Sequence, residues 1–271
     1  SYMSDTLLLN LSALLALLPA SLAAQRKIAA RDTVFWLVLG VAIAGPALLL
    51  VVTSTDGWHS DLSTALWTTI ITSLLLFAIM SVIIRDAWRL SPLFTPHMFI
   101  FGLFAAAWAT LNKGIAPVPT NTLSGWVILH IVASITTYGL ITIGSVAALA
   151  AIFQERALKA KKQTRLVHTL PSLAGCDGMV ILLLGMGEAV LVIGLLSGMA
   201  LEISDTGSLF SFNHKTILTL TAFVVIGCLL FAHFKFGLRG RKAARLVLLG
   251  YLFLTLGYLG VKFVTNVLLA G

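Results

Sequence analysis

The strongest constraint in this sequence is a succession of eight apolar segments separated by short polar gaps. The hydrocarbon layer of a membrane is about 30 Å thick, and a helix that rises about 1.5 Å per residue crosses it in about 20 residues. Backbone groups find no water there, so each crossing segment must be a helix. The sequence therefore predicts an all-α, polytopic transmembrane helical bundle. The predicted spans lie near residues 7–24, 34–53, 64–84, 96–111, 124–153, 178–203, 215–234 and 244–268.

The composition excludes an ordinary soluble protein. Hydrophobic residues make up 59% of the 271 positions and charged residues 10%, and the mean hydropathy is +1.01. Soluble domains hold roughly 45–50% apolar and about 25% charged residues, so much of this apolar surface must face lipid. Because the polar gaps are short, we expect a single membrane domain over residues 1–271.

Lysine and arginine alternate between the gaps and predict the orientation of the helices. Most of the 18 basic residues fall in the first, third, fifth and seventh gaps, and such enrichment is typical of cytoplasmic loops. We therefore expect the N and C termini on the periplasmic side of a bacterial inner (cytoplasmic) membrane. The basic residues that follow the first span have the opposite placement to a signal peptide. The net charge of +8 thus reflects topology, and the expected partners are the lipid bilayer and another membrane or periplasmic protein, not nucleic acid.

Three ionisable residues inside the predicted spans need a reason to be there, since each costs at least about 2–3 kcal/mol on insertion scales. They are His130, Glu188 and Lys262. Glu188 and Lys262 favour either a buried ion pair, or separate roles as a proton-relay or cation site and as an anchor for an anionic group. Gly194 and Gly198 form a GxxxG motif, which indicates close helix packing.

Two histidines are predicted at a similar depth near the external face. His130 lies in the fifth span, and His214 stands at the start of the seventh. Together they could bind a metal or the iron of a haem; otherwise His130 bonds to a neighbouring helix and His214 faces headgroups. Trp126 precedes His130 by one helical turn and either stacks on a flat ligand or belongs to the interfacial tryptophan belt. A polar stripe typical of bonding between helices continues from His130 through Ser134, Thr137 and Tyr138.

Other chemistries lack their signatures. Cys176 and Cys228 form no CxxC, CxxCH or zinc spacing, so thiol-redox chemistry and covalent haem attachment are not indicated. No nucleotide loop, Ser/His/Asp set, HExxH motif or paired carboxylates occur. We predict no catalytic residues, and a function other than an enzyme is favoured.

The second half of the chain, residues 120–268, resembles cytochrome c assembly proteins of the CcsA/CcmC/ResC type. Several short motifs carry the resemblance in order along the chain. They are Trp-Val-Ile-Leu-His at 126–130, Thr-Tyr-Gly at 137–139, Leu-Pro-Ser-Leu at 170–173 and His-Lys-Thr at 214–216. The stretches Phe-Gly-Leu-Arg-Gly at 236–240 and Tyr-Leu-Gly-Val-Lys-Phe at 258–263 look like the YpjD-like branch of that superfamily.

The resemblance implies a membrane haem-binding protein in which His130 is a ligand of the haem iron. Segment 208–213 reads Ser-Leu-Phe-Ser-Phe-Asn, without the tryptophans by which family members are taken to present haem to apocytochrome c. Haem binding is thus implied more strongly than haem delivery. We predict haem b between His130 and His214, beside Trp126, with Lys215 and Lys262 near the propionates.

Two alternatives remain open at this point. The first is a non-haem accessory subunit of a membrane transport or repair complex, which would be colourless. The second is a small-solute or proton transporter that uses Glu188. Transporters commonly show inverted repeats and broken helices, and the sequence shows neither, so this alternative ranks last.

Overall fold

The computed structural model describes residues 2–26, 30–54, 61–111, 124–207 and 213–267, and within these ranges it contains helices and no strand. Eight of the described helices are long and apolar enough to cross a membrane, which confirms the predicted number. The chain divides into two compact units: unit 1 comprises residues 1–122 and 164–171, and unit 2 comprises residues 123–163 and 172–271. Each unit is described separately.

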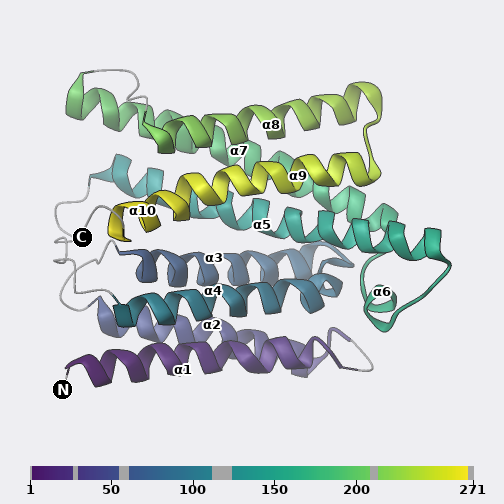
Figure 1. Cartoon of the computed structure of the whole chain (residues 1–271), viewed down its shortest axis with the longest axis horizontal. Coiled ribbons are helices and arrows are strands. Elements are labelled where there is room, and N and C mark those ends of the chain that lie inside the picture. Colours follow the sequence, from purple (N-terminus) through teal and green to yellow (C-terminus); the bar gives the residue numbers. More distant parts are fainter. Residues whose placement is uncertain (1, 27–29, 55–60, 112–123, 208–212, 268–271) are drawn as a thin grey trace. The chain divides into compact units, whose positions relative to one another are not determined.

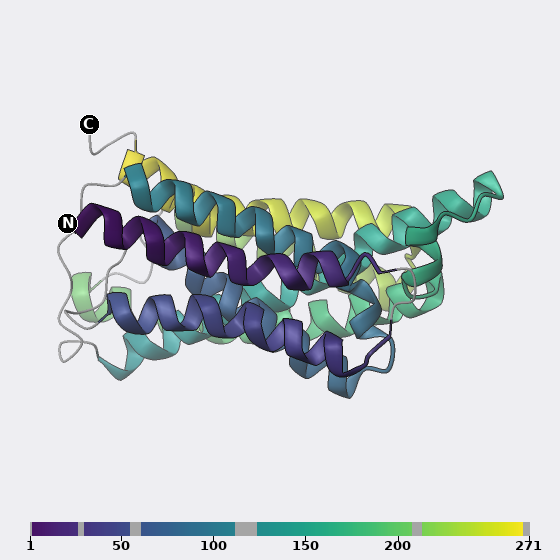
Figure 2. The same ribbon diagram turned by 90° about the horizontal axis from the view of Figure 1, so that it is seen from below.

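Unit 1 is a ring of four membrane-length helices in chain order. They are α1 (Tyr2–Ala23), α2 (Thr33–Thr53), α3 (Leu62–Ile83) and α4 (Ser91–Leu111). Figure 1 and the turned view in Figure 2 show them side by side, with α1 and α3 each packed on both α2 and α4. A 3₁₀ turn, η1 (Ala87–Leu90), precedes α4, and the short helix α6 (Arg165–Thr169) completes the unit.

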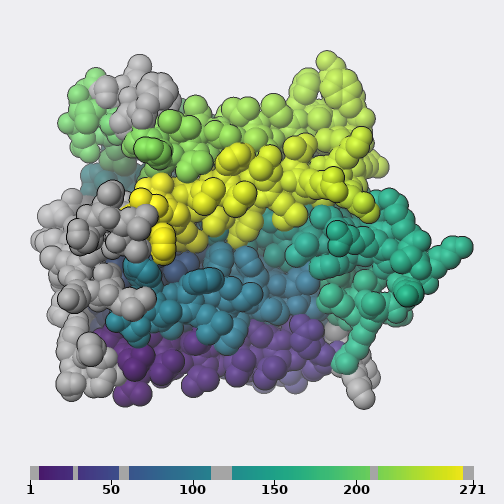
Figure 3. All heavy atoms as spheres, in the orientation of Figure 1, coloured from purple at the N-terminus to yellow at the C-terminus, as the bar shows by residue number. Residues whose placement is uncertain are grey.

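Unit 2 repeats the same order of neighbours, and its helices α5 and α7 are longer than those of unit 1. They are α5 (Gly125–Ala160), α7 (Leu173–Thr206), α8 (His214–Phe236) and α9 (Gly240–Thr255). Helix α5 packs on α7 and α9, and α8 packs on the same two; the space-filling view in Figure 3 shows α8 and α9 side by side. A π-helical segment, η3 (Leu256–Gly260), joins α9 to α10 (Val261–Val267). The middle of α5 is the buried core of this ring.

Polar residues at the helix starts fix where several helices begin. The side chains of Asp32, Asp61, Ser124 and Asn213 each accept a hydrogen bond from a backbone N–H in the first turn, as expected of N-caps. Asp32 also pairs with Arg26, whose Nη1 lies 3.1 Å from Asp32 Oδ2. That hydrogen bond holds the pKa of Asp32 below its ordinary value.

The fourth span starts earlier than its proline suggested. Helix α4 begins at Ser91 and contains Pro96, whereas the sequence predicted a start at Pro96. Because proline has no N–H, the carbonyl of Pro92 is left without its helical partner. The Nε2 of Gln25 donates to that carbonyl oxygen at 3.0 Å. A side chain from outside the helix therefore satisfies the group that the proline leaves free.

The polar gap between the fifth and sixth spans is shorter than predicted and is not a simple loop. Helix α5 continues to Ala160, α7 starts at Leu173, and α6 lies between them. Arg165 Nη2 donates to the carbonyl of Gln25 at 2.8 Å, and Arg89 Nε donates to the carbonyl of Thr169 at 2.9 Å. The segment around α6 is thus bound to the ends of α1 and α4 within unit 1.

Candidate ligand-binding cavity

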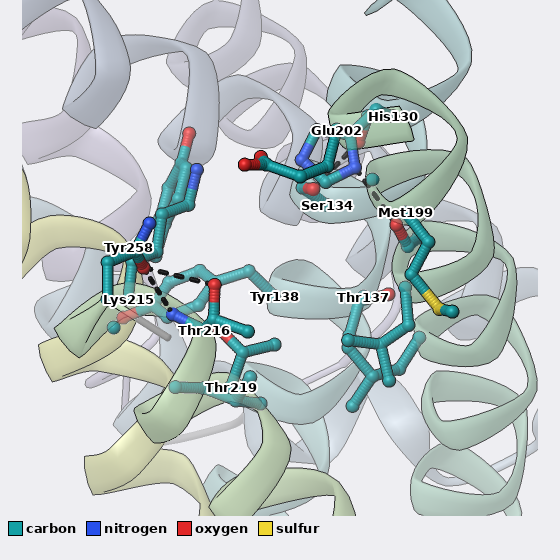
Figure 4. Close-up of a pocket in the computed structure, with 17 residues that line it drawn as sticks. His130, Ser134, Thr137, Tyr138, Met199, Glu202, Lys215, Thr216, Thr219 and Tyr258 are labelled. Carbon is teal, nitrogen blue, oxygen red and sulfur yellow. Dashed lines mark hydrogen bonds between the residues drawn. The ribbon is translucent and has the colours of Figure 1, made fainter. Parts of the chain in front are cut away.

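A cavity of about 210 Å³ lies within unit 2, enclosed by α5, α7, α8 and the junction of α9 with η3. Figure 4 shows the side chains around it. Apolar residues of α7 and α9 form part of the wall, and a few polar groups converge on the space from α5, α7 and α8. Such a mixture is typical of small-molecule sites.

His130 is held in a defined orientation by α7. Its Nδ1 lies 2.9 Å from the carbonyl oxygen of Gly194. A carbonyl only accepts, so Nδ1 carries the hydrogen and Nε2 keeps its lone pair. This is the arrangement that a metal-binding imidazole needs, because the backbone bond fixes both the tautomer and the ring. The hydroxyl of Ser197 also donates to the Gly194 carbonyl at 3.0 Å.

The GxxxG motif of α7 provides the seat for this imidazole. A Cβ atom placed on Gly198 would lie 3.1 Å from His130 Cε1, a tighter contact than most real Cβ atoms make, so the ring would have to shift. A Cβ on Gly194 would lie 3.6 Å from the Cβ of Ala133, an ordinary contact. Close helix packing at the motif is therefore confirmed, and the motif has a second role, which is to let the ring of His130 lie against α7.

Thr137 contributes a buried hydroxyl without a partner to the wall of the cavity. The residue is 2% exposed, and no described residue bonds to its Oγ1. The neighbouring Tyr138 differs, because its hydroxyl lies 2.9 Å from Thr255 Oγ1 and donates to the Tyr251 hydroxyl at 3.2 Å. Buried polar groups are almost always bonded. The Thr137 hydroxyl thus indicates that a ligand or water supplies the missing partner.

A cation and an anion face the cavity where α7 ends and α8 begins. Lys215 comes from the first turn of α8 and Glu202 from the last turns of α7. In Figure 4 the Glu202 carboxylate extends from α7 toward the side that holds Lys215 and Tyr258. Among the ion pairs within 4.0 Å in the described ranges, none involves either residue. Lys215 is therefore available to pair with an anionic group of a ligand.

The structure brings together only part of the predicted site. His130 and Lys215 line the same cavity. His214 is the exposed first residue of α8 and does not line it. Trp126 is 57% exposed and Lys262 lies on α10, and neither of them reaches the wall. Paired ligation by His130 and His214 remains a prediction, as do the roles of Trp126 and Lys262.

Several lining residues were not predicted from the sequence, among them Met199, Glu202 and Tyr258. Glu202 lies at the end of the predicted sixth span, α7 continues past it to Thr206, and its spacing from Met199 places both on one helix face. The three-residue spacing of Met199 and Glu202 could have indicated from the sequence that the two share a helix face. Tyr258 lies in η3, and no pattern in the sequence marks a π-helical turn, although such turns are frequent at functional sites.

Glu188 stands apart from the cavity. Both of its carboxylate oxygens are buried, and neither has a hydrogen-bond partner within the described chain. Lys262 therefore does not donate to it, and the predicted alternative of a buried ion pair between the two is not formed. No group of three or more His, Cys, Asp or Glu side chains that could hold a metal ion occurs among the described residues.

Comparisons with known proteins agree with the motifs of the second half. Residues 47–269 match the family described as Cytochrome C assembly protein. A protein of Azospirillum brasilense, "Uncharacterized 28.8 kDa protein in nifR3-like 5'region", is 48% identical over 273 residues, which cover 98% of this chain and all of the relative.

Two more distant relatives carry the name cytochrome c biogenesis protein CcsA. The protein of Chlamydomonas reinhardtii is 26% identical over 151 residues, or 55% of this chain and 41% of the relative. The protein of Guillardia theta is 24% identical over 181 residues, or 59% and 60%. The matched regions thus span about half of each CcsA chain. No solved structure matches this chain.

Proposed function

We propose, from the premise that this chain belongs to the Cytochrome C assembly protein family, that it binds haem b in the cavity of unit 2. Family membership supports a haem-handling role in cytochrome c maturation, and the eight membrane-competent helices support a multi-pass membrane protein. The single observation that carries the proposal is His130, whose Nδ1 is bound to the Gly194 carbonyl while the ring borders the cavity. Its Nε2 is the atom that would ligate the iron.

The chemistry of the cavity fits a haem in three respects. A neutral imidazole with its far nitrogen fixed is a common axial ligand of haem iron. Lys215 provides a cation that forms no ion pair with the described residues, which suits a propionate. The unpartnered hydroxyl of Thr137 provides a hydrogen-bonding group on an otherwise largely apolar wall. When bound, the haem supplies an iron centre that accepts imidazole ligands and one electron.

The residues of this chain orient the ligand in the proposed complex. Gly194 holds the tautomer of His130, and Gly198 leaves room for its ring. Lys215 attracts a propionate toward the junction of α7 and α8. We further propose that this junction faces the periplasm in a bacterial inner membrane, since the basic residues concentrate at the other helix ends. We also propose His214 as a second ligand of the iron. Its support is that His214 directly precedes Lys215, which lines the cavity.

The absorption spectrum of the purified protein tests the proposal. We expect a Soret band from the wild type, and we expect His130→Ala to remove or strongly weaken it. His168→Ala is a matched control, because His168 is exposed on α6 and does not line the cavity. His214→Ala decides whether the second imidazole binds: a shifted band indicates two histidine ligands, and an unchanged band indicates one. A colourless wild type supplied with haem would contradict the proposal and favour the accessory-subunit alternative.

A further inference from the structure

Glu188 lies in a closed notch between α7 and α8. Both carboxylate oxygens are buried, and a Cβ on Gly227 of α8 would lie 3.1 Å from Glu188 Oε1. The glycine therefore makes the room that the carboxyl group occupies. Neither oxygen accepts a hydrogen bond within the described part of the chain. A buried acid with no bonding partner among the described residues has no counter-charge there to stabilise its ionised form.

The position of Glu188 relates it to the cavity. On α7 the wall residues Leu191, Leu195 and Met199 follow Glu188 by 3, 7 and 11 positions. These spacings place all four on one face of a helix with 3.6 residues per turn. Glu188 is thus the next residue on that face, about one turn beyond Leu191 and away from the Glu202 end. The cavity and the buried acid are neighbours along the same helix.

No titratable group on the helices packed against α7 bonds to Glu188. On α5, the nearest in register is Tyr138, two residues before Leu140, which lies against Gly187. Its hydroxyl is bonded to Tyr251 and lies within bonding distance of Thr255. On α8, Cys228 follows Gly227. His130 and Lys215 lie toward the other end of the cavity. Within the described part of the chain, Glu188 thus has no bonded titratable neighbour, and the cavity lies about one helical turn away along α7.

We propose that Glu188 is a proton-binding site whose protonation responds to the charge of the ligand in the adjacent cavity. Without a ligand, Glu188 is a neutral carboxylic acid. A ferric haem held by His130 would add positive charge to the cavity, which would favour loss of the Glu188 proton to the surrounding water, and this part rests on the proposed function. On reduction of such a haem by an external one-electron donor, the carboxylate would take up one proton from water and become the neutral acid again. One electron on the iron is then balanced by one proton on Glu188.

Infrared spectroscopy tests the site without haem. We expect the ligand-free wild type to show the carbonyl band of a protonated carboxylic acid that shifts in D₂O, and we expect Glu188→Gln to lack it. Glu202→Gln is the control, because Glu202 lines the cavity and accepts a bond from Thr206. A band that persists in Glu188→Gln, or a carboxylate signal lost in its place, would overturn the proposal. The glutamine has nearly the same shape, so we expect the variant to fold.

The reduction potential tests the coupling to haem. One proton per electron changes the equilibrium constant tenfold per pH unit, which corresponds to about 59 mV for a one-electron couple. With dithionite as the reductant, we expect the midpoint potential of the haem-loaded wild type to fall with rising pH toward this slope, and that of Glu188→Gln to be nearly flat. Equal slopes in both would overturn the coupling. A protein that shows the carboxylic acid band but no Soret band would contradict the haem proposal and still support Glu188 as a proton-binding site.

Discussion

Unit 1 and unit 2 are both rings of four helices in which each helix packs on the same relative neighbours, yet they treat their buried polar side chains differently. In unit 1, Asn10 is 3% exposed and Trp67 1% exposed, and Trp67 Nε1 donates to Asn10 Oδ1 at 2.8 Å. Asn10 Nδ2 in turn donates to the carbonyl of Thr6 at 2.9 Å. These polar groups are bonded to their own bundle.

In unit 2, several polar side chains have no bonding partner among the described residues. The hydroxyl of Thr137 and the carboxylate of Glu188 are buried without partners, and Lys215 forms no ion pair within the described ranges. His130 is bonded at one nitrogen, and the same ring borders a cavity. Buried hydroxyls without a partner in the described part of the chain also occur in unit 1, at Ser73 and Ser81. What distinguishes unit 2 is that His130, Thr137 and Lys215 border one cavity, whereas the Asn10–Trp67 pair of unit 1 is bonded within its own bundle.

The largest expected effect on ligand binding comes from adding a side chain at Gly198, against which the ring of His130 lies. Gly198→Val places a branched side chain where a Cβ would already lie 3.1 Å from the imidazole. The ring must move and lose its bond to Gly194, so we expect haem affinity to fall at least about tenfold, or about 1.4 kcal/mol. Spectroscopic haem titration measures the change.

Gly185 offers a matched control on the same helix, because a Cβ there would meet nothing within 4 Å. We expect Gly185→Val to bind haem like the wild type and to cost little stability, since glycine is a poor helix former. Equal haem affinities for the Gly198 and Gly185 variants would show that the position of the imidazole does not matter for binding.

A smaller effect, confined to stability, is expected in unit 1. Asn10→Leu leaves the buried Trp67 N–H without an acceptor, which costs about 1–3 kcal/mol of unfolding free energy. The double variant Asn10→Leu/Trp67→Phe removes both polar groups, so the hydrogen-bond part of the loss should be recovered. Unfolding in detergent measures stability, and haem binding should remain as in the wild type. A loss of haem affinity in Asn10→Leu would show that the polar pair of unit 1 also affects ligand binding, and not stability alone.

The number of helices could be predicted from sequence because each span is a local property of about 20 residues. The ends of the helices were less predictable, since they depend on contacts made elsewhere. Pro96 marked a plausible start, but Gln25 satisfies the carbonyl that the proline leaves open, and α4 begins at Ser91. The sixth span was predicted over residues 178–203, whereas α7 runs from Leu173 to Thr206, because polar and charged residues at its ends made the apolar segment look shorter.

Individual residues of the site could be predicted only where an ionisable side chain interrupts or adjoins an apolar span. His130 was found because an ionisable group inside a span is unusual, and Lys215 was named as a partner for the propionates of the implied haem; both line the cavity. The seat of His130 could not be predicted, since it depends on the register of α5 against α7, which brings Nδ1 to the Gly194 carbonyl. Tyr258 reaches the cavity from the π-helical turn, a local change of register that apolar periodicity does not reveal.

The smallest expected effect is a gain in stability, whereas most substitutions in a protein core lower stability. Thr137→Val replaces a buried hydroxyl that has no partner with a methyl group of similar size. Burying such a hydroxyl costs about 1–3 kcal/mol by mutational measures, so we expect the ligand-free variant to be up to about 1 kcal/mol more stable than the wild type. A Val substitution at Thr142, whose hydroxyl donates to the Tyr138 carbonyl at 2.6 Å, should destabilise instead. If Thr137→Val proves less stable than the wild type without ligand, the hydroxyl has a partner in the bundle, and unit 2 resembles unit 1 more closely than its open groups indicate.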